Sequence, residues 1–272
     1  MRLIAPAILA AGPALACPDA AEVDALAASW LAGEPAAAVA AGADMETAYC
    51  AQEMLVERLT AERGEPVGYK AGLTSPATQE RFGVSSPLHG VLLADMMLED
   101  GATVPAAFGA RPIVEADLVL VVGDAAINDA ATPEEVLAHV SAVHPFIELA
   151  DLVVAEGEPL DASVIVAIGV GARMGVLGAA IEPTPDMAET LASMTVRLAG
   201  PDGAVLSEAP GAAVLDHPLN AVTFLTGAGI ELEPGDLVSV GSMGPPQPPA
   251  PGTYTATYMG LPGDPSVSVT FE

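Results

Sequence analysis

The segment RPIVEADLVLVVGD, residues 111–124, restricts the fold of this chain more than any other stretch. Its apolar residues predict a long strand, yet two acids, Glu115 and Asp117, lie in its middle. Residues two apart in a strand point to the same face, so both acids share a face with Val119 and Val121. Two like charges at a partly buried position cost free energy unless another group compensates for them.

A second acid-bearing strand is predicted at HPFIELADLVV, residues 144–154, where Glu148 lies among apolar residues. Three carboxylates on two strands could supply the oxygen ligands of a hard cation such as Mg²⁺ or Mn²⁺. The same spacing fits an arrangement in which the acids lie at the mouth of the sheet and face water. The histidines show no zinc-ligand spacing, and the sequence carries no phosphate-binding glycine motif.

The rest of the chain predicts an α+β fold, because strands and helices do not alternate regularly. Helical spacing covers Ala20–Leu31, and Asp44 is a candidate N-cap for a helix over Met45–Arg63. We expect strands at residues 66–74 and 90–98, a strand or strand pair at 163–178, a hairpin at 194–208, a helix over 211–225 interrupted at a proline, and short strands after residue 235.

The chain is strongly acidic, with 36 Asp and Glu residues against 8 Lys and Arg residues and a formal net charge of −28. Such a surface repels nucleic acids and anionic membranes, so neither is an expected partner. Hydrophobic residues make up 51% of the 272 positions, which is enough for one sizeable core. We therefore expect a single domain over residues 17–272, with an N-terminal helical segment over about residues 17–64.

Residues 1–16 predict a signal peptide, because Arg2 precedes an apolar run and the Ala-Leu-Ala before Cys17 fits a cleavage site. The run is too short and too interrupted to span a membrane. We therefore expect an exported, periplasmic protein. The two cysteines, Cys17 and Cys50, favour a disulfide in that compartment, with lipid attachment at Cys17 or two free buried thiols as alternatives.

Lys70 is the only lysine of the chain and lies in the segment GYKAGLTS. This segment and five others occur in the order seen in a known group of enzymes: GVLLADMML, RPIVEADLVLVVG, HPFIELAD, DHPLNAVTFL and GDLVSVGS. From about Asp44 onward, the chain resembles the 2-keto-4-pentenoate hydratase and 4-oxalocrotonate decarboxylase group of the fumarylacetoacetate hydrolase superfamily, whose members mostly act in aromatic catabolism.

The resemblance implies a mixed β-roll with peripheral helices that forms a fumarylacetoacetase-like catalytic domain. It also implies a Mg²⁺ or Mn²⁺ site and a small carboxylic acid as substrate, with a homo-oligomer as a further possibility. By position in the matching motifs, the metal ligands are Glu115, Asp117 and Glu148, the catalytic residues are Lys70 and Asp95, and the substrate-binding residues are Tyr69 and Ser242.

Two departures from the group bear on the site. Asp117 is shorter than the glutamate usual at that position, and a segment that is polar in the group reads AIGVGARMGVLG here. We expect Arg173 within this segment either to bind a substrate carboxylate or to face solvent.

The expected activity is hydratase-like addition of water to a 2-oxo or 2-hydroxy-dienoic acid. The alternatives are a decarboxylase, a carbon–carbon hydrolase, or an exported protein that binds organic acids without catalysis.

Overall fold

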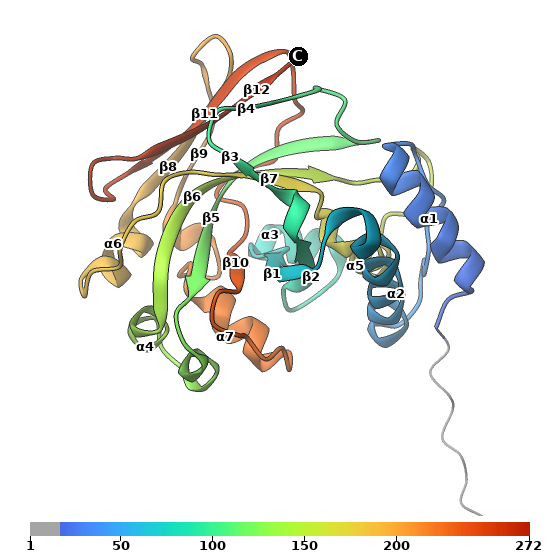
Figure 1. The fold of residues 1–272 in the computed structure, drawn as a ribbon, viewed down its shortest axis with the longest axis horizontal. Coiled ribbons are helices and arrows are strands. Elements are labelled where there is room, and N and C mark those ends of the chain that lie inside the picture. Colours follow the sequence, from blue (N-terminus) through green and yellow to red (C-terminus); the bar gives the residue numbers. More distant parts are fainter. Residues whose placement is uncertain (1–16) are drawn as a thin grey trace, which may run out of the picture.

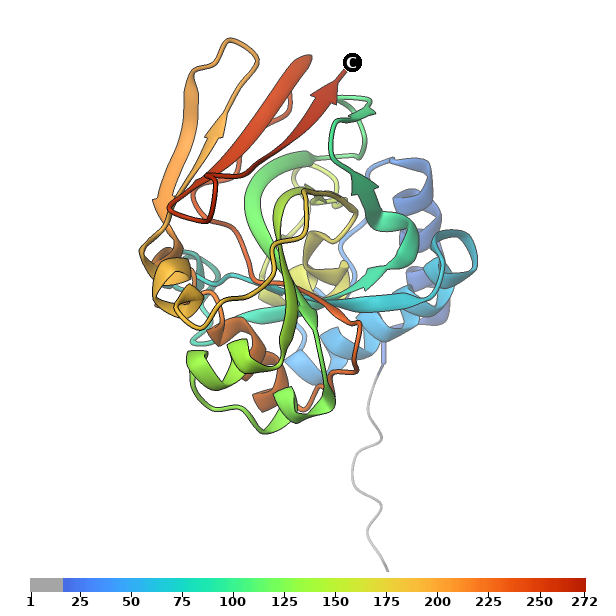
Figure 2. The same ribbon diagram turned by 60° about the vertical axis from the view of Figure 1, so that its left-hand side comes forward.

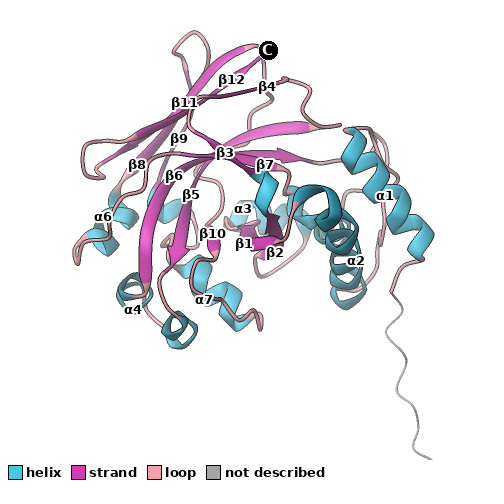
Figure 3. Ribbon diagram, viewed as in Figure 1, coloured by secondary structure: helices cyan, strands magenta, loops and turns pink. Residues whose placement is uncertain are grey.

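The computed structural model describes residues 17–272, so the predicted signal peptide at residues 1–16 lies outside the described part of the chain. The smaller of two β-sheets lies at the top of the molecule and the larger below it, with the helices along the lower and right-hand sides (Figures 1 and 3). The α+β class predicted from the sequence is confirmed. None of the helices between residues 17 and 272 combines the length and the apolarity needed to cross a bilayer.

The larger sheet has seven strands and carries the acids discussed above. Its members along the chain are β1 (Pro66–Gly72), β2 (Leu88–Leu93), β3 (Met97–Glu99), β5 (Pro112–Val122), β6 (Val140–Asp151), β7 (Met174–Leu177) and β10 (Leu237–Ser239). In space they follow the order β2-β1-β10-β5-β6-β7-β3. The β1–β10 and β3–β7 pairs are parallel, and the other pairs are antiparallel.

The smaller sheet has five strands in the order β4-β12-β11-β8-β9. These are β4 (Ala102–Val104), β8 (Thr195–Ala199), β9 (Val205–Pro210), β11 (Gly252–Met259) and β12 (Ser266–Phe271). The predicted hairpin is β8–β9. In Figure 2 this sheet, drawn in orange and red with the short green β4, lies beside the long strands β5 and β6 of the larger sheet.

Seven α-helices and four short 3₁₀ segments complete the described residues. The helices are α1 (Ala20–Ala32), α2 (Met45–Arg63), α3 (Pro76–Phe82), α4 (Pro133–Ala138), α5 (Ala162–Ala167), α6 (Met187–Ser193) and α7 (Asn220–Gly227). The 3₁₀ segments are η1 (Ala94–Met96), η2 (Ala125–Asp129), η3 (Gly169–Gly171) and η4 (Gly211–Ala213).

The N-terminal helices form where the sequence predicts them. The Asp44 carboxylate accepts a hydrogen bond from the Thr47 amide at 2.8 Å and so caps the first turn of α2. The apolar face of α1, which includes Trp30, is buried against α2 and α5 in a second hydrophobic cluster. Because α1 is short, this burial rather than helix propensity stabilises it.

The structure corrects the interpretation of residues 163–178. Only their last part is a strand, β7, and the run that includes Val164, Ile165 and Val166 is the helix α5. The Asp161 carboxylate accepts a hydrogen bond from the Val164 amide at 3.0 Å and caps this helix. Every residue of α5 is buried, so the helix shows no polar face, and periodicity alone cannot distinguish it from a buried strand.

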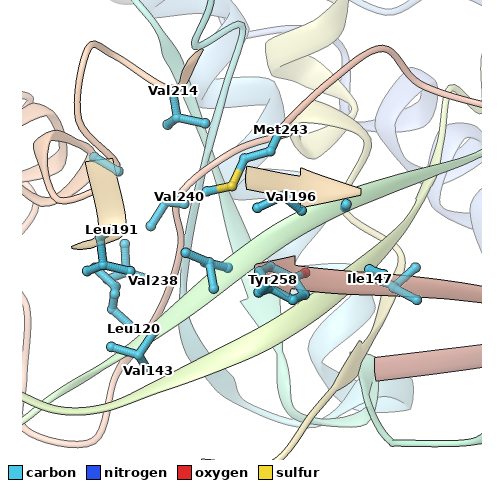
Figure 4. Close-up of a cluster of buried hydrophobic side chains, with 14 of the residues drawn as sticks. Leu120, Val143, Ile147, Leu191, Val196, Val214, Val238, Val240, Met243 and Tyr258 are labelled. Carbon is cyan, nitrogen blue, oxygen red and sulfur yellow. The ribbon is translucent and has the colours of Figure 1, made fainter. Parts of the chain in front are cut away.

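The main core lies between the two sheets. Figure 4 shows part of it, with Val196, Val238 and Met243 around the ring of Tyr258. Tyr258 is fully buried on β11, and its hydroxyl lies 2.5 Å from the Asp117 carbonyl oxygen and 2.7 Å from that of Phe146, which share its one proton. This contact joins the smaller sheet to β5 and β6 beside the acids. Burial raises the pKa of Tyr258, so the hydroxyl stays protonated and able to donate.

Cys17 and Cys50 form a disulfide that joins the start of the described chain to α2, with Cα atoms 5.5 Å apart. The bridge closes a loop with a sequence separation of 33 residues. Closing such a loop restricts the unfolded chain more than the folded one.

We expect the double variant Cys17→Ser, Cys50→Ser to lose about 3–4 kcal/mol of unfolding free energy, because its unfolded chain gains the freedom that the bridge removes. Urea unfolding of the wild type with and without reductant, alongside the variant, measures this loss. Equal transition midpoints in all three samples would show that the bridge does not stabilise the fold.

Candidate active site

The pairing of β5 with β6 brings the predicted acids together. Glu115 lies directly opposite Glu148 in the antiparallel register, and Asp117 lies two residues further along β5. Because side chains alternate along strands, the three carboxylates project from the same face of the sheet. Directly opposite residues have Cβ atoms only about 4.5–5.5 Å apart, so Glu115 and Glu148 are close neighbours.

Lys70 reaches this cluster from β1. It is only 3% exposed, and its ammonium donates a hydrogen bond to Glu148 Oε1 in an ion pair. In the sheet, β10 and β5 lie between β1 and β6, so in a flat sheet the two strands would be about 14 Å apart. The contact therefore requires a strongly curved sheet, with Lys70 and the three acids on its concave side.

The short side chain of Asp117 is held by β10 and its following loop. Ser239 Oγ donates to Asp117 Oδ2 at 2.5 Å, and the Gly241 amide donates to Oδ1 at 2.9 Å. The Leu118 amide also donates to Oδ1, at 2.6 Å. Both carboxylate oxygens of this fully buried residue thus have protein partners.

Burial and mutual repulsion change the protonation of these acids. Burial and the neighbouring Glu148 carboxylate raise the pKa of Glu115 to about 7, although Lys70 and a hydrogen bond from Ser242 lower it in part. The same two causes raise the pKa of Asp117 to about 7, opposed by the Ser239 and Leu118 hydrogen bonds. The site therefore holds more negative charge than its single lysine can neutralise.

The excess of negative charge at this site favours the binding of a divalent cation. Three carboxylates and one ammonium leave a formal charge of −2 when all are ionised, and oxygen donors suit Mg²⁺ or Mn²⁺. Within residues 17–272, no three acidic, His or Cys side chains already surround one point as a metal cage does. Since the Asp117 oxygens are engaged by β10 and its loop, Glu115 and Glu148 are the carboxylates best placed to hold a cation.

Two of the predicted site residues lie elsewhere. Tyr69 points to the opposite face of β1 from Lys70, because adjacent side chains in a strand alternate. There it lines a cavity of about 1130 Å³ with Tyr49, His89 and Phe224, apart from the acids. Asp95 is exposed in η1. Gly90 lies opposite Lys70 in the β1–β2 pair, and η1 begins only after a further run of about 10 Å along β2. The prediction of a catalytic role for Asp95 is not supported by this placement.

The structure also corrects the interpretation of Arg173. Its side chain is 6% exposed, and its guanidinium donates to the carbonyls of Phe108 at 2.5 Å and Trp30 at 2.8 Å. It forms an ion pair with the buried Asp151 at 3.4 Å and lies over the Trp30 ring at 4.6 Å. Arg173 therefore ties α1 to the larger sheet, and neither a substrate contact nor a solvent-facing position fits these contacts.

Sequence reasoning missed Ser239, which orients Asp117. A signal was available, because Ser239 is a polar residue in the apolar run LVSV and lies opposite Val119 in the neighbouring strand. Ser242, which the resemblance did indicate, lies near Glu115, and its hydroxyl donates to the Gly244 carbonyl at 2.8 Å.

Comparison with known proteins gives this geometry a context. The family described as fumarylacetoacetate (FAA) hydrolase C-terminal matches residues 75–264, more than half of the chain. The chain belongs to this family. It is 33% identical to a 2-keto-4-pentenoate hydratase of Burkholderia vietnamiensis over 225 residues, which cover 81% of this chain and 84% of the hydratase. It is 32% identical to a TodF product hydratase of Pseudomonas putida, over 77% of this chain and 78% of that one.

A solved structure matches the same group of enzymes as the sequence relatives. The 4-oxalocrotonate decarboxylase of Pseudomonas putida G7, complexed with magnesium and adipate, matches with a TM-score of 0.81 and 25% identity over 93% of this chain and 97% of its own. The resemblance noted from the sequence motifs is thereby confirmed. These relatives are enzymes, so the chain is a member of an enzymatic family.

We expect the Arg173→Met variant to lose about 3–5 kcal/mol of unfolding free energy, because it leaves the buried Asp151 carboxylate without its cation. The matched control is Arg197→Met, which breaks the exposed Arg197–Glu208 pair and should cost at most about 1 kcal/mol. Urea unfolding compares the two variants. Equal losses would contradict the structural role of Arg173.

The raised pKa of Glu115 predicts a pH dependence of stability. Between the usual value of 4.5 and about 7, the folded protein keeps a proton that the unfolded chain has lost. Stability of the metal-free protein should therefore fall as pH rises through this window. Glu115→Gln should remove part of this pH dependence. Its free energy of unfolding at pH 8 should be about 1–3 kcal/mol higher than that of the wild type. Thermal unfolding at several pH values with a chelator tests this, and parallel curves for the two proteins would refute it.

Proposed function

We propose that this protein is a divalent-metal-dependent hydratase that adds water to a 2-hydroxy-dienoic acid. The observation that carries the proposal is the buried Lys70–Glu148 pair beside Glu115 and Asp117 on one concave sheet face. The names of the sequence relatives support the reaction class. The magnesium bound by the related decarboxylase supports Mg²⁺ as the cation, with Mn²⁺ as the alternative.

Glu115 and Glu148 would hold the cation, while Asp117 ties β5, which carries Glu115, to β10 and its following loop. A bound divalent cation supplies a Lewis acid that polarises the oxygen atoms of a 2-oxo acid. A substrate carboxylate also brings negative charge to a face that already has an excess of it, so neutralisation by a cation is needed for binding.

The residues of the chain would move the protons. Overall, the reaction adds the hydrogen and the hydroxyl of one water molecule across a carbon–carbon double bond. Lys70 would donate a proton to a substrate carbon and take one back from the water that adds, while Glu148, its hydrogen-bond partner, holds the ammonium in place. Because Lys70 is almost fully buried, bulk water does not compete for these transfers.

A decarboxylase is the second candidate function, favoured by the structural match to 4-oxalocrotonate decarboxylase. The two reactions give different products, since one adds water and the other releases carbon dioxide. Product analysis after incubation with a dienoate and with a dicarboxylate distinguishes them.

We also propose that the protein is exported. The disulfide between Cys17 and Cys50 and the apolar segment of residues 1–16 support this proposal. Fractionation of cells that produce the full chain, followed by N-terminal sequencing of the secreted form, tests it.

We expect Lys70→Met to lower turnover of 2-hydroxypenta-2,4-dienoate by about 10²–10⁴-fold, because the proton donor is lost while the side-chain volume is kept. The loss of ultraviolet absorbance of the dienoate in the presence of Mg²⁺ or Mn²⁺ measures the rate. Arg197→Met removes another cation, from an exposed hairpin, and should leave the rate unchanged. Near-normal turnover by Lys70→Met would remove the lysine from the mechanism.

A further inference from the structure

The turn η3, Gly169–Gly171, crosses the face of the sheet that carries the acids. The Gly169 carbonyl packs directly on Gly90, so closely that a side chain at position 90 would overlap it. Gly90 lies opposite Lys70 in the β1–β2 pair, and the Lys70 Cγ atom lies 3.3 Å from the point that a Cβ of residue 90 would occupy. One end of the turn therefore lies beside the alkyl chain of Lys70.

The other end of the turn reaches β6. A Cβ at Gly171 would lie 3.6 Å from the Cβ of Ala150, which is two residues from Glu148 and on the same face. Between the two ends, the Val170 side chain packs on Gly72, where a Cβ would overlap it. Gly72 is two residues from Lys70 on β1. The turn thus spans from the strand of Lys70 to the strand of Glu148 on the face that carries their ion pair.

The backbone of Val170 is unusual for a β-branched residue. It has φ 55° and ψ 33°, in the left-handed region, where the glycines on either side also lie with φ 71° and 73°. A β-branched side chain is strongly disfavoured there, and such strain persists only where the surroundings hold it. Here the surroundings are Gly72 and Gly90, whose missing side chains make room for the turn.

The turn offers an apolar wall and no positive charge. Val170 is 8% exposed and joins the hydrophobic cluster around α1, α2 and α5. Arg173, the next cation along the chain, directs its guanidinium to Phe108, Trp30 and Asp151. Lys70 is already paired with Glu148. A second carboxylate on a substrate would therefore find no cation in the turn and would lie near three acids.

We propose that the η3 turn is a fixed cap over the Lys70 end of the site and that Val170 determines which substrates enter. The cap admits monocarboxylic 2-oxo or 2-hydroxy-dienoic acids with a short, uncharged end. It excludes those with a longer end, which collides with Val170, and those with a second carboxylate, which finds no cation in the turn. This inference rests on the proposed function, since it assumes that a 2-oxo or 2-hydroxy acid binds beside Lys70.

The test compares kcat/KM for 2-hydroxypenta-2,4-dienoate, a homologue two carbons longer, and 2-hydroxymuconate as the dicarboxylate. The wild type should prefer the first over each of the others by at least about tenfold. Val170→Ala and Val170→Gly should each reduce the discrimination against the longer homologue by about tenfold, because they remove the colliding methyl groups. Discrimination against the dicarboxylate should persist in both variants, because neither adds a cation.

Two controls separate a change in the cap from a change in folding. Val170→Gly suits the left-handed backbone, so it should fold at least as well as the wild type, as circular dichroism can show. Val196→Ala removes the same two methyl groups from a fully buried valine in the smaller sheet. That control should lower the thermal midpoint without changing the substrate ratio.

A binding measurement separates this inference from the proposed function. Calorimetry with Mn²⁺ and the saturated 2-oxo acids of the same lengths gives ratios of Kd that do not require turnover. If dienoates are bound but not converted, the proposed reaction fails while these ratios still test the cap. If the ratios of kcat/KM and Kd are the same in the wild type, Val170→Gly and Val196→Ala, the cap does not select substrates and the inference is wrong.

Discussion

The concentration of three carboxylates, two of them buried and one half-buried, beside one lysine is the constraint on which the rest of the site depends. Glu115 and Glu148 face each other across two long strands, and Asp117 follows on the same face. Lys70 can reach Glu148 only because the sheet curves, so the ion pair depends on the curvature. The raised pKa values of Glu115 and Asp117 show that one ammonium does not neutralise this face.

The surrounding structure holds these charges in place from three directions. Tyr258, which belongs to the smaller sheet, hydrogen-bonds to the backbone of β5 and β6. Ser239 and Gly241 hold the Asp117 carboxylate from the β10 side. The η3 turn packs on β1 and β2 beside the alkyl chain of Lys70. Since side chains supported in this way have few alternative positions, the site is organised before any substrate arrives.

Much of this arrangement could be predicted from the sequence, but only where a local pattern carried the information. The α2 cap at Asp44 and the shared face of Glu115 and Asp117 follow from spacing of three and two residues. Their meeting with Glu148 and Lys70 depends on strand order, which the resemblance supplied and spacing could not.

The predictions that the structure corrects concern features on which no local sequence pattern carries information. The helix α5 was interpreted as a strand because burial on all sides removes the periodicity that distinguishes the two. Neither a substrate contact nor a solvent-facing position holds for Arg173, because its partners, Trp30, Phe108 and Asp151, are distant in sequence. The placement of Asp95 in an exposed turn likewise depends on where β2 ends, which a run of apolar residues does not show.

Titration calorimetry with Mn²⁺ on the metal-free protein at pH 7.5 tests the central claim most directly. The account predicts one bound ion per chain, with protons released on binding because Glu115 and Asp117 are partly protonated beforehand. Binding should be lost in Glu148→Gln and retained in Arg197→Met. Absence of Mn²⁺ uptake by the wild type, or equal uptake by Glu148→Gln, would contradict the account.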